Sequence, residues 1–278
     1  MGEAIASRAA ALLRCAHPGP SLVVSAIIVA LATVHQGAHG PLAPLVIGVV
    51  AGQFSIGYAN DAFDAGRDRR AGRLDKPVVA GRISRRTVFV AACVALAVNV
   101  LLCFVVGSVT GVVNLVMMAA GWAYNAGLKS TAWSAAMYAI GFGLIPAFAA
   151  STLPDTPPVP AWAYAAAALL GLGGHFANVL YDLDSDLRAG VRGLPQRIAT
   201  AHPRGPAVVR VLCLLLLAAS TVLVALSQGP ALRWPLLLVT AGVAVTGILG
   251  RGRTPFVAAM GVAVLDVAAL VFGTPIFG

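Results

Sequence analysis

Long apolar runs alternate with short polar segments along this chain. An apolar helix of about 20 residues crosses the hydrocarbon core of a bilayer, and sliding-window hydropathy identifies such helices. Nine transmembrane helices are predicted, at residues 21–39, 41–62, 85–107, 108–125, 133–152, 160–181, 207–227, 231–249 and 254–275. The run 108–125 is the weakest, because Gly111, Asn114 and Gly121 interrupt it. The pattern predicts an all-α integral membrane protein.

The first run follows Arg8 and Arg14, an arrangement that a signal peptide also has. It is long enough to be a span and further spans follow, so we interpret it as an uncleaved first helix. Residues 3–15 are expected to form an amphipathic helix at the membrane interface.

Composition supports the membrane interpretation. Hydrophobic residues make up 59% of the 278 residues, the mean hydropathy is +0.88, and only 10% are charged, against about a quarter in soluble domains. A soluble protein with these values would have too little polar surface to face water. The four cysteines have no metal-binding spacing and are expected to be reduced packing residues.

The net charge of +9 suggests a nucleic-acid partner until its distribution is considered. If the N-terminus is cytoplasmic, the nine-helix topology leaves only Arg233 of the 19 basic residues on the opposite side. This is the positive-inside pattern. It predicts a multi-pass plasma membrane protein with a cytoplasmic N-terminus, an external C-terminus, membrane lipids as partners and no nucleic acid.

An acidic cluster ends the second apolar run, in the stretch YANDAFDAGRDRRAGRLDKP at 58–77. Asn60, Asp64 and Asp68 lie four residues apart, with Asp61 beside them, although the chain has only ten acidic residues. Residues at this spacing share one face of a helix. The cluster therefore places a carboxylate ladder at the cytoplasmic end of a helix.

A second ladder follows at an offset of 118 residues, formed by Asn178, Asp182 and Asp186. At the same offset the Arg-Ala-Gly at 70–72 matches 188–190. We therefore predict that the two segments belong to parallel repeats within one chain.

Two carboxylate ladders at a membrane boundary suffer repulsion and desolvation. Pairing with nearby arginines is one interpretation of them. The other is two or three Mg²⁺ ions, which take oxygen ligands and leave positions for water and substrate phosphates. The predicted metal ligands are Asn60, Asp61, Asp64, Asp68, Asn178, Asp182 and Asp186.

Basic residues follow both ladders, and guanidinium groups bind phosphate oxygens in pairs. Anionic lipid headgroups and topology account for several of them. The predicted diphosphate ligands are Asn60, Arg67, Arg73, Lys129, Arg188 and Arg192. An apolar helix bundle would hold the hydrocarbon part of a lipid diphosphate.

These features resemble the UbiA superfamily of intramembrane prenyltransferases. Its first motif, N-D-x-x-D-x-x-x-D, is matched from Asn60 to Asp68, and its second, D-x-x-x-D, by Asp182 and Asp186. LDKPVVAGRIS and RAGVRGLP are also similar to stretches of that family. The family often has a Tyr and a Lys four residues apart after the fourth helix, whereas Tyr124 and Lys129 are five apart here.

The resemblance implies a single domain over 1–278, with two parallel four-helix repeats at about 21–130 and 133–250 and an extra helix at 254–275. These helices would surround a central cavity, with Mg²⁺ and a prenyl diphosphate at its cytoplasmic rim. It also implies ionisation to an allylic cation that an electron-rich acceptor attacks. On this interpretation Asp64, Asp182, Arg67 and Lys129 are catalytic. His175 either orients the acceptor or takes a proton, or is only a hydrogen-bonded intramembrane histidine.

The sequence leaves the acceptor, the prenyl chain length and the reaction type open. A membrane terpene cyclase with the same metal chemistry is an alternative, although the low aromatic content of 7% favours a transferase. A transporter or lipid binder is a further alternative. Asp266 is either functional or paired with His35 or a helix carbonyl, and Asn99 and Asn114 are candidates for hydrogen bonds between helices.

Overall fold

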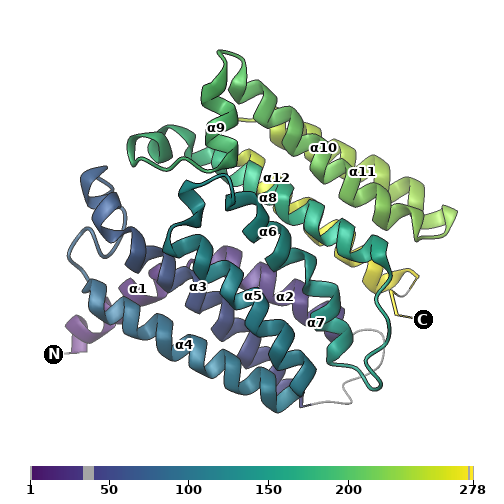
Figure 1. The fold of residues 1–278 in the computed structure, drawn as a ribbon, viewed down its shortest axis with the longest axis horizontal. Helices are drawn as coiled ribbons and strands as arrows, with labels where there is room; N and C mark the ends of the chain where they lie inside the picture. Colours follow the sequence, from purple (N-terminus) through teal and green to yellow (C-terminus); the bar gives the residue numbers. More distant parts are fainter. Residues whose placement is uncertain (1, 34–40, 275, 278) are drawn as a thin grey trace.

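The computed structural model describes residues 2–33, 41–274 and 276–277, and this part of the chain contains helices and no strand (Figure 1). The helices are α1 (Gly2–Cys15), α2 (Pro18–Thr33), α3 (Leu42–Arg70), α4 (Arg85–Val106), α5 (Ser108–Ala126), η1 (Leu128–Ser130), α6 (Ser134–Gly143), α7 (Ile145–Ser151), α8 (Ala161–Arg188), α9 (Leu194–Ala201), α10 (Gly205–Leu226), α11 (Pro230–Leu249) and α12 (Thr254–Phe272).

Seven helical segments in the described residues are long and apolar enough to cross a membrane. They are α3, α4, α6 with α7, α8, α10, α11 and α12, and the number is eight if α1 and α2, bent by 56°, form one span. The predicted run 108–125 is helical as α5 but does not meet this criterion. Part of the predicted run 21–39 lies outside the described residues. The protein is therefore a multi-pass helical membrane protein, and the count of nine stays a prediction.

The run predicted as one helix at 133–152 is two helices, α6 and α7, separated at Leu144. Pro146 lies in the first turn of α7, and proline there has no N–H to continue the hydrogen bonds of α6. The two helices together form one candidate span, Ser134–Ser151, which agrees with the predicted run. The break at Leu144 was not predicted, because apolar periodicity does not register it.

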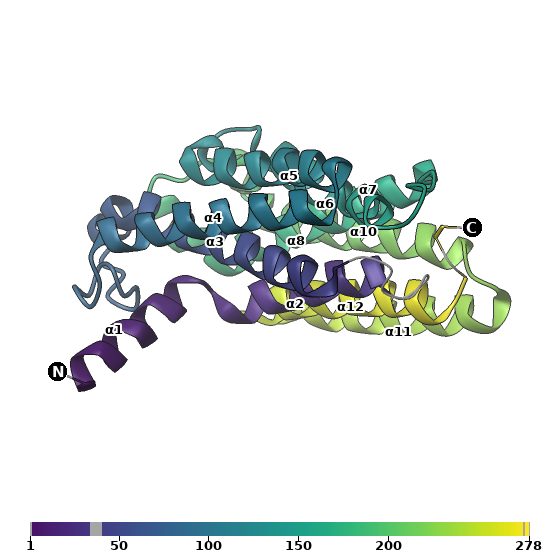
Figure 2. The same ribbon diagram turned by 90° about the horizontal axis from the view of Figure 1, so that it is seen from below.

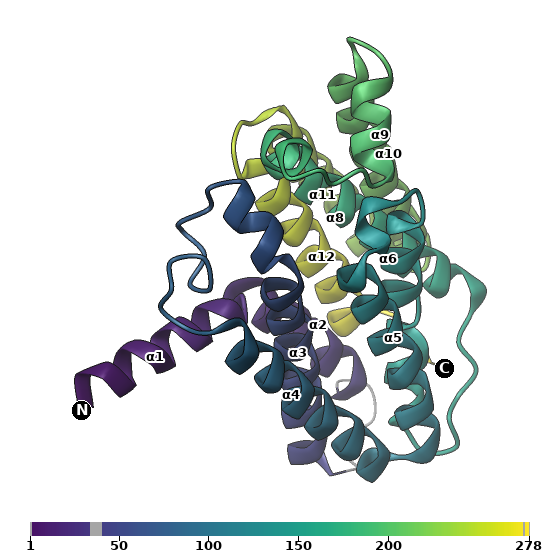
Figure 3. The ribbon, with the colours of Figure 1, turned by 60° about the vertical axis from the view of Figure 1, so that its left-hand side comes forward.

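The helices form two groups that meet around a central region. α3 packs against α4, and α8 packs against α10. The helix α6 contacts both α5 and α8, and α12 contacts both α2 and α8, so these two helices join the groups. Figure 3 shows α2 and α12 running side by side, whereas α1 extends away from the bundle (Figure 2).

Both helices that carry the acidic ladders end in the same way. The backbone N–H of Arg73 donates to the carbonyl of Asp68, and that of Val191 donates to the carbonyl of Asp186, at 3.0 and 2.9 Å. Gly72 and Gly190, which precede the two donors, have φ of +69° and +77°. This is the Schellman ending, which favours glycine at the left-handed position. The two ladder ends are locally alike, and the division of the whole chain into two repeats stays a prediction.

Buried side-chain amides join α3, α4 and α5, as expected for Asn99 and Asn114. The Nδ2 group of Asn114 donates to Oδ1 of Asn99 at 2.7 Å, and Asn99 donates to the carbonyl of Gly48 at 2.8 Å. A Cβ at Gly52 would lie 2.6 Å from the Asn99 amide, so glycine there permits the close approach of α3 and α4. The four cysteines are free, and three of them are buried.

Candidate active site

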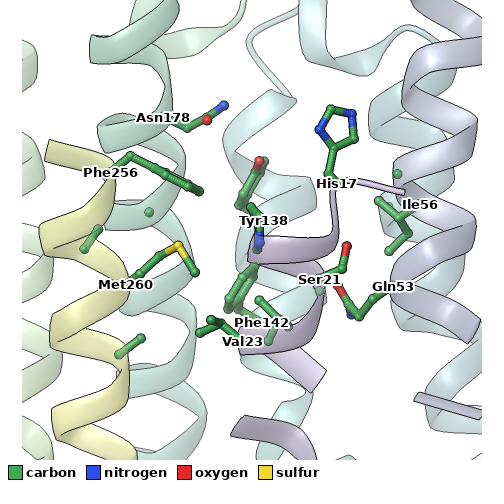
Figure 4. A pocket seen from close by; sticks show the side chains of 18 of the residues that line it. His17, Ser21, Val23, Gln53, Ile56, Tyr138, Phe142, Asn178, Phe256 and Met260 are labelled. Carbon is green, nitrogen blue, oxygen red and sulfur yellow. The ribbon is translucent and has the colours of Figure 1, made fainter. Parts of the chain in front are cut away.

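A cavity of about 920 Å³ lies between the two groups of helices. Figure 4 shows side chains from several helices around it, among them His17, Gln53, Tyr138, Asn178 and Met260. All seven predicted metal ligands line it: Asn60, Asp61, Asp64, Asp68, Asn178, Asp182 and Asp186. The structure therefore brings the two ladders to one space, and we call the end where they lie the mouth.

Asp64 lies between two cations at the mouth. Its Oδ1 accepts a hydrogen bond from Arg67 at 2.6 Å, and its Oδ2 accepts one from the ammonium group of Lys129 at 2.5 Å. Arg67 also donates to the hydroxyl group of Ser130. Lys129 lies in η1, just after α5, and its side chain is 5% exposed. The predicted lysine thus reaches the first ladder across 65 residues of sequence.

Asp61 is held by two residues that the sequence analysis did not assign to the site. Its Oδ1 accepts a hydrogen bond from Lys76 at 2.6 Å and lies 2.9 Å from Nε2 of His17. His17 is the bend between α1 and α2, where its φ is +49°, a sparsely populated conformation for a residue other than glycine. The bend places the imidazole ring of His17 beside Asp61 of α3.

Asn60 and the second ladder have partners from other segments. The Asn60 amide donates to Oδ1 of Asn125 at 3.0 Å, and Asn125 in turn donates to the carbonyl of Ile56. On the opposite wall, Gln196 at the start of α9 donates to Oδ2 of Asp186 at 2.8 Å. Asp182 takes part in none of the ion pairs of the described residues.

The pKa values of two cations outside the spans reflect this arrangement. Burial lowers the pKa of the Lys129 ammonium group, and the adjacent carboxylate of Asp64 opposes this decrease. Burial likewise acts to lower the pKa of Arg73, but the hydrogen bond that Arg73 donates to Asp75 and the charges of Asp75, Asp182 and Asp68 raise this pKa overall. Arg73 follows the first ladder and interacts with Asp182 of the second, so the two ladders share one electrostatic environment.

Some predicted site residues do not line the cavity. Arg67, Arg73 and Lys129 do, whereas Arg188 and Arg192 are not among the described lining residues. Arg192 instead donates to the carbonyl groups of Leu187 and Val191. The sequence did not predict this difference, because the ladder spacing fixes the helix face only of Asn178, Asp182 and Asp186.

His175 lies behind the cavity wall rather than on it. Its ring stacks on Tyr138, with ring centroids 4.5 Å apart, and contacts Tyr124 edge-on. Both tyrosines line the cavity. Nε2 of His175 lies 3.1 Å from the hydroxyl group of Ser134, and buried Nδ1 has no hydrogen-bond partner among the described residues. The position of His175 suits support of the two tyrosines better than contact with a substrate.

Asp266 is buried on the cavity wall and is 2% exposed. Its two oxygens accept hydrogen bonds from the hydroxyl groups of Thr221 at 2.9 Å and Ser220 at 3.1 Å. The expected partner was a helix carbonyl or His35. The partners are these two hydroxyl groups and not a helix carbonyl, and His35 lies outside the described residues.

The side chains at the mouth fit a hard divalent cation. Within the described residues no three carboxylate, imidazole or thiolate groups are close enough to hold one ion by themselves. The donors are carboxylate and amide oxygens from two facing ladders, and Mg²⁺ in proteins commonly uses one or two carboxylates together with substrate phosphates. The donor set therefore suits Mg²⁺ shared with a phosphorylated ligand.

Sequence reasoning missed several residues at the mouth, among them His17, Asn125 and Gln196. His17 and Asn125 are 44 and 65 residues from their ladder partners, and Gln196 is ten residues from Asp186 beyond the end of α8. None of the three lies in a motif, so only the tertiary fold reveals them. Lys76 had a usable signal, because it closes the basic run after the first ladder.

The fold and the site define a helical membrane protein whose apolar cavity opens between two acidic ladders. Residues 21–265 of this sequence match the sequence model of the UbiA prenyltransferase family. The chain belongs to the UbiA prenyltransferase family. No curated protein matches it significantly in sequence.

Solved structures with the same fold include a UbiA homologue from Archaeoglobus fulgidus bound to GPP and Mg²⁺. It has a TM-score of 0.70 and 16% identity, over 93% of this chain and 97% of that one. A UbiA homologue from Aeropyrum pernix K1 without ligand has a TM-score of 0.69 and 18% identity, over 90% and 95%. Digeranylgeranylglyceryl phosphate synthase has a TM-score of 0.65 and 12% identity, over 96% and 98%.

Proposed function

We propose that this protein transfers a prenyl group from a polyprenyl diphosphate to an aromatic or lipid-like acceptor, with Mg²⁺, at the cytoplasmic face of the plasma membrane. One observation carries the proposal: two carboxylate ladders from α3 and α8 line one mouth of a cavity that continues between apolar helices. Homologues with this fold bind GPP or DMAPP together with Mg²⁺.

The proposed metal ligands are the carboxylates and amides of the two ladders, from Asn60 to Asp68 and from Asn178 to Asp186. Bound Mg²⁺, two or three ions, supplies positive charge that stabilises the departing diphosphate. Lys129, Arg67 and Arg73 provide fixed positive charge at the same place, and preorganised charge of this kind favours ionisation of the C–O bond to an allylic cation.

The cavity then has to protect the cation from water until the acceptor attacks it. Apolar side chains such as Ile27, Met117 and Phe256 line its interior. The tyrosine rings of Tyr124 and Tyr138 lie on its wall, and aromatic faces attract cations. We propose that His175 holds these two rings in place through its stacking contacts.

The same aromatic side chains favour one alternative, a membrane terpene cyclase. The chain has few aromatic residues, but Phe142, Trp162 and Phe256 line the cavity in addition to the two tyrosines. A cyclase uses such rings to stabilise a migrating cation. Product analysis separates the two reactions.

The test is incubation of the purified protein with Mg²⁺ and geranyl, farnesyl or geranylgeranyl diphosphate, with and without candidate acceptors. We expect pyrophosphate release and a prenylated acceptor, both abolished when EDTA removes the metal. A cyclic hydrocarbon or alcohol formed from the diphosphate alone would show a cyclase instead. Absence of pyrophosphate release from every chain length would support a transporter or lipid binder.

Substitutions at the ladders test the two-ladder site separately. Asp64→Ala or Asp182→Ala is expected to abolish turnover while the protein stays folded, because each removes a proposed metal ligand from one wall. Asp184→Asn is the matched control, since Asp184 lies on α8 between two ladder residues but is exposed and does not line the cavity. Near-normal rates in either alanine variant would contradict the site.

A further inference from the structure

One carboxylate lies on the inner wall of the cavity, away from the two ladders. The helix α12 lines the cavity along one face, through Phe256, Met260, Ala263 and Leu270, and Figure 4 shows Phe256 and Met260 on this face. Asp266 lies in the same series. The other lining carboxylates of the described residues belong to the ladders or, for Asp75, to the loop at the mouth.

Asp266 is far from the mouth along the helix. Arg253, which directly precedes α12, lies over the ring of Tyr181 at 5.3 Å, next to Asp182 of the second ladder. Thirteen residues separate Arg253 from Asp266, and α12 is continuous between them. At 1.5 Å per residue this is about 20 Å. Neutral polar side chains such as Ser21, Gln53 and Ser220 also line the cavity, but Asp266 is the one carboxylate on the wall away from the mouth among the described residues.

The hydrogen bonds of Asp266 leave part of its capacity unused. Each oxygen accepts one hydroxyl group, from Thr221 or Ser220, whereas a carboxylate offers about four lone-pair sites. No cation forms an ion pair with it among the described residues. The remaining acceptor sites are satisfied only by water or by a polar group inside the cavity.

We propose that Asp266 is a specificity-determining residue that limits the length of the prenyl chain. This inference rests on the proposed function, in which the diphosphate binds at the mouth and the hydrocarbon chain extends inward. A chain that ends before Asp266 does not reach the carboxylate of the inner wall. A longer chain would place hydrocarbon against Asp266, where its remaining acceptor sites could not be paired, and this costs binding free energy.

The test compares kcat/KM for geranyl, farnesyl, geranylgeranyl and longer prenyl diphosphates. We expect a decrease at the first length that reaches Asp266. Asp266→Val, which is apolar but no smaller, is expected to raise the relative kcat/KM of that length and longer ones by about tenfold to a hundredfold. Asp266→Asn keeps a polar side chain of the same size and is expected to keep the decrease.

Two further variants separate polarity from size. Asp266→Ala both removes the carboxyl group and adds space, so relaxation in this variant without relaxation in Asp266→Val would show a steric limit and overturn the proposal. Thr221→Val removes one hydroxyl donor at nearly constant shape. It leaves Asp266 more dependent on water and is expected to strengthen the discrimination against long chains, and an unchanged or weaker discrimination would contradict the proposal.

Binding of prenyl alcohols distinguishes failure of this inference from failure of the proposed function. Geraniol, farnesol and geranylgeraniol occupy the apolar cavity without needing turnover, and the thermal stabilisation that each gives can be measured in detergent. If the wild type turns over no diphosphate, the proposed function fails, while the alcohol series still reports on Asp266. Val264→Ala is the control, because Val264 is on α12 but 49% exposed on its outer face. Equal alcohol profiles in the wild type and Asp266→Val would overturn the inference.

Discussion

Asp61 and Asp64 show how acidic side chains are accommodated at a membrane boundary. Each contacts cationic or imidazole side chains from outside its own ladder. Asp64 pairs with Lys129, and Asp61 pairs with Lys76 and His17. Nearby positive charge offsets the repulsion between carboxylates and their desolvation. The same cations are placed where the departing diphosphate of the proposed reaction would lie.

Lys129 provides the residue-scale prediction. Lys129→Ala removes a buried positive charge from the mouth, and we expect kcat to fall by about 10²- to 10³-fold, as on loss of one preorganised donor. Steady-state kinetics with saturating Mg²⁺ measures this. Lys129→Arg is expected to recover part of the rate because it keeps the charge, and Arg86→Ala, an exposed site on the same membrane side, serves as the control. A loss confined to KM would argue against a role of Lys129 in the reaction step.

At this scale the sequence predicted the ladders and the two cations beside Asp64, Arg67 and Lys129, but not the other partners of the ladders. The spacing of Asn60, Asp64 and Asp68 fixes a shared helix face, and all three line the cavity. Gln196 and His17 reach the ladders only because α9 and the α1–α2 bend fold back on them. Such contacts follow from no local pattern and therefore required the structure.

The bend between α1 and α2 depends on a glycine in another helix. A Cβ at Gly57 of α3 would lie 2.6 Å from the carbonyl oxygen of Ala16 and 2.8 Å from its carbonyl carbon. These are backbone atoms, so a larger side chain at position 57 would have to displace the bend itself. The bend holds His17 beside Asp61, and Gly57 is thus linked to the geometry of the mouth.

Gly57→Ala is the prediction at the scale of helices. We expect the free energy of unfolding to fall by about 1–3 kcal/mol, the usual cost of inserting a methyl group into a packed contact. Thermal unfolding in detergent measures the loss, and turnover is expected to fall as His17 moves away from Asp61. Gly242→Ala is the control, because a Cβ there meets nothing within 4 Å. Equal stability of the two variants would contradict this account of the bend.

Helix positions were predicted better than helix ends. The predicted runs 41–62 and 160–181 correspond to α3 and α8, but both helices continue to Arg70 and Arg188. Hydropathy ends where charge begins, whereas helical hydrogen bonding continues through the ladders to the glycine endings. The short helix α9 lies between the predicted runs 160–181 and 207–227 and was not predicted, because its eight residues are too few for a clear periodic pattern.

At the scale of the whole molecule, hydrogen bonds between helix ends and loops hold together both ends of the helix bundle. At the mouth, Arg14 donates to the carbonyl of Asp75, which joins α1 to the loop after α3. At the other end, Thr152 donates to the carbonyl of Ala32, and Oε1 of Gln228 accepts from the backbone of Thr274. Arg233, the single basic residue assigned to this end, donates to the carbonyl groups of Ala225 and Leu226. Arg233 therefore satisfies carbonyl groups in the last turn of α10. This local role accounts for a basic residue at the end where the positive-inside pattern predicts none.

Cysteine labelling tests the predicted orientation and the contribution of α2 to the span count. In a background with Cys93→Ala, which removes the exposed native thiol, single cysteines are introduced at Ser7, Arg82 and Asp155. The positive-inside distribution predicts that Arg82→Cys reacts with a membrane-impermeant maleimide only after permeabilisation, and that Asp155→Cys reacts in intact cells. Ser7→Cys is expected to behave like Arg82→Cys if α2 crosses the membrane, since α2 and α3 then return the chain to the same side. Labelling of Ser7→Cys in intact cells, with Arg82→Cys still protected, would show that α2 does not cross and would reduce the number of spans below nine.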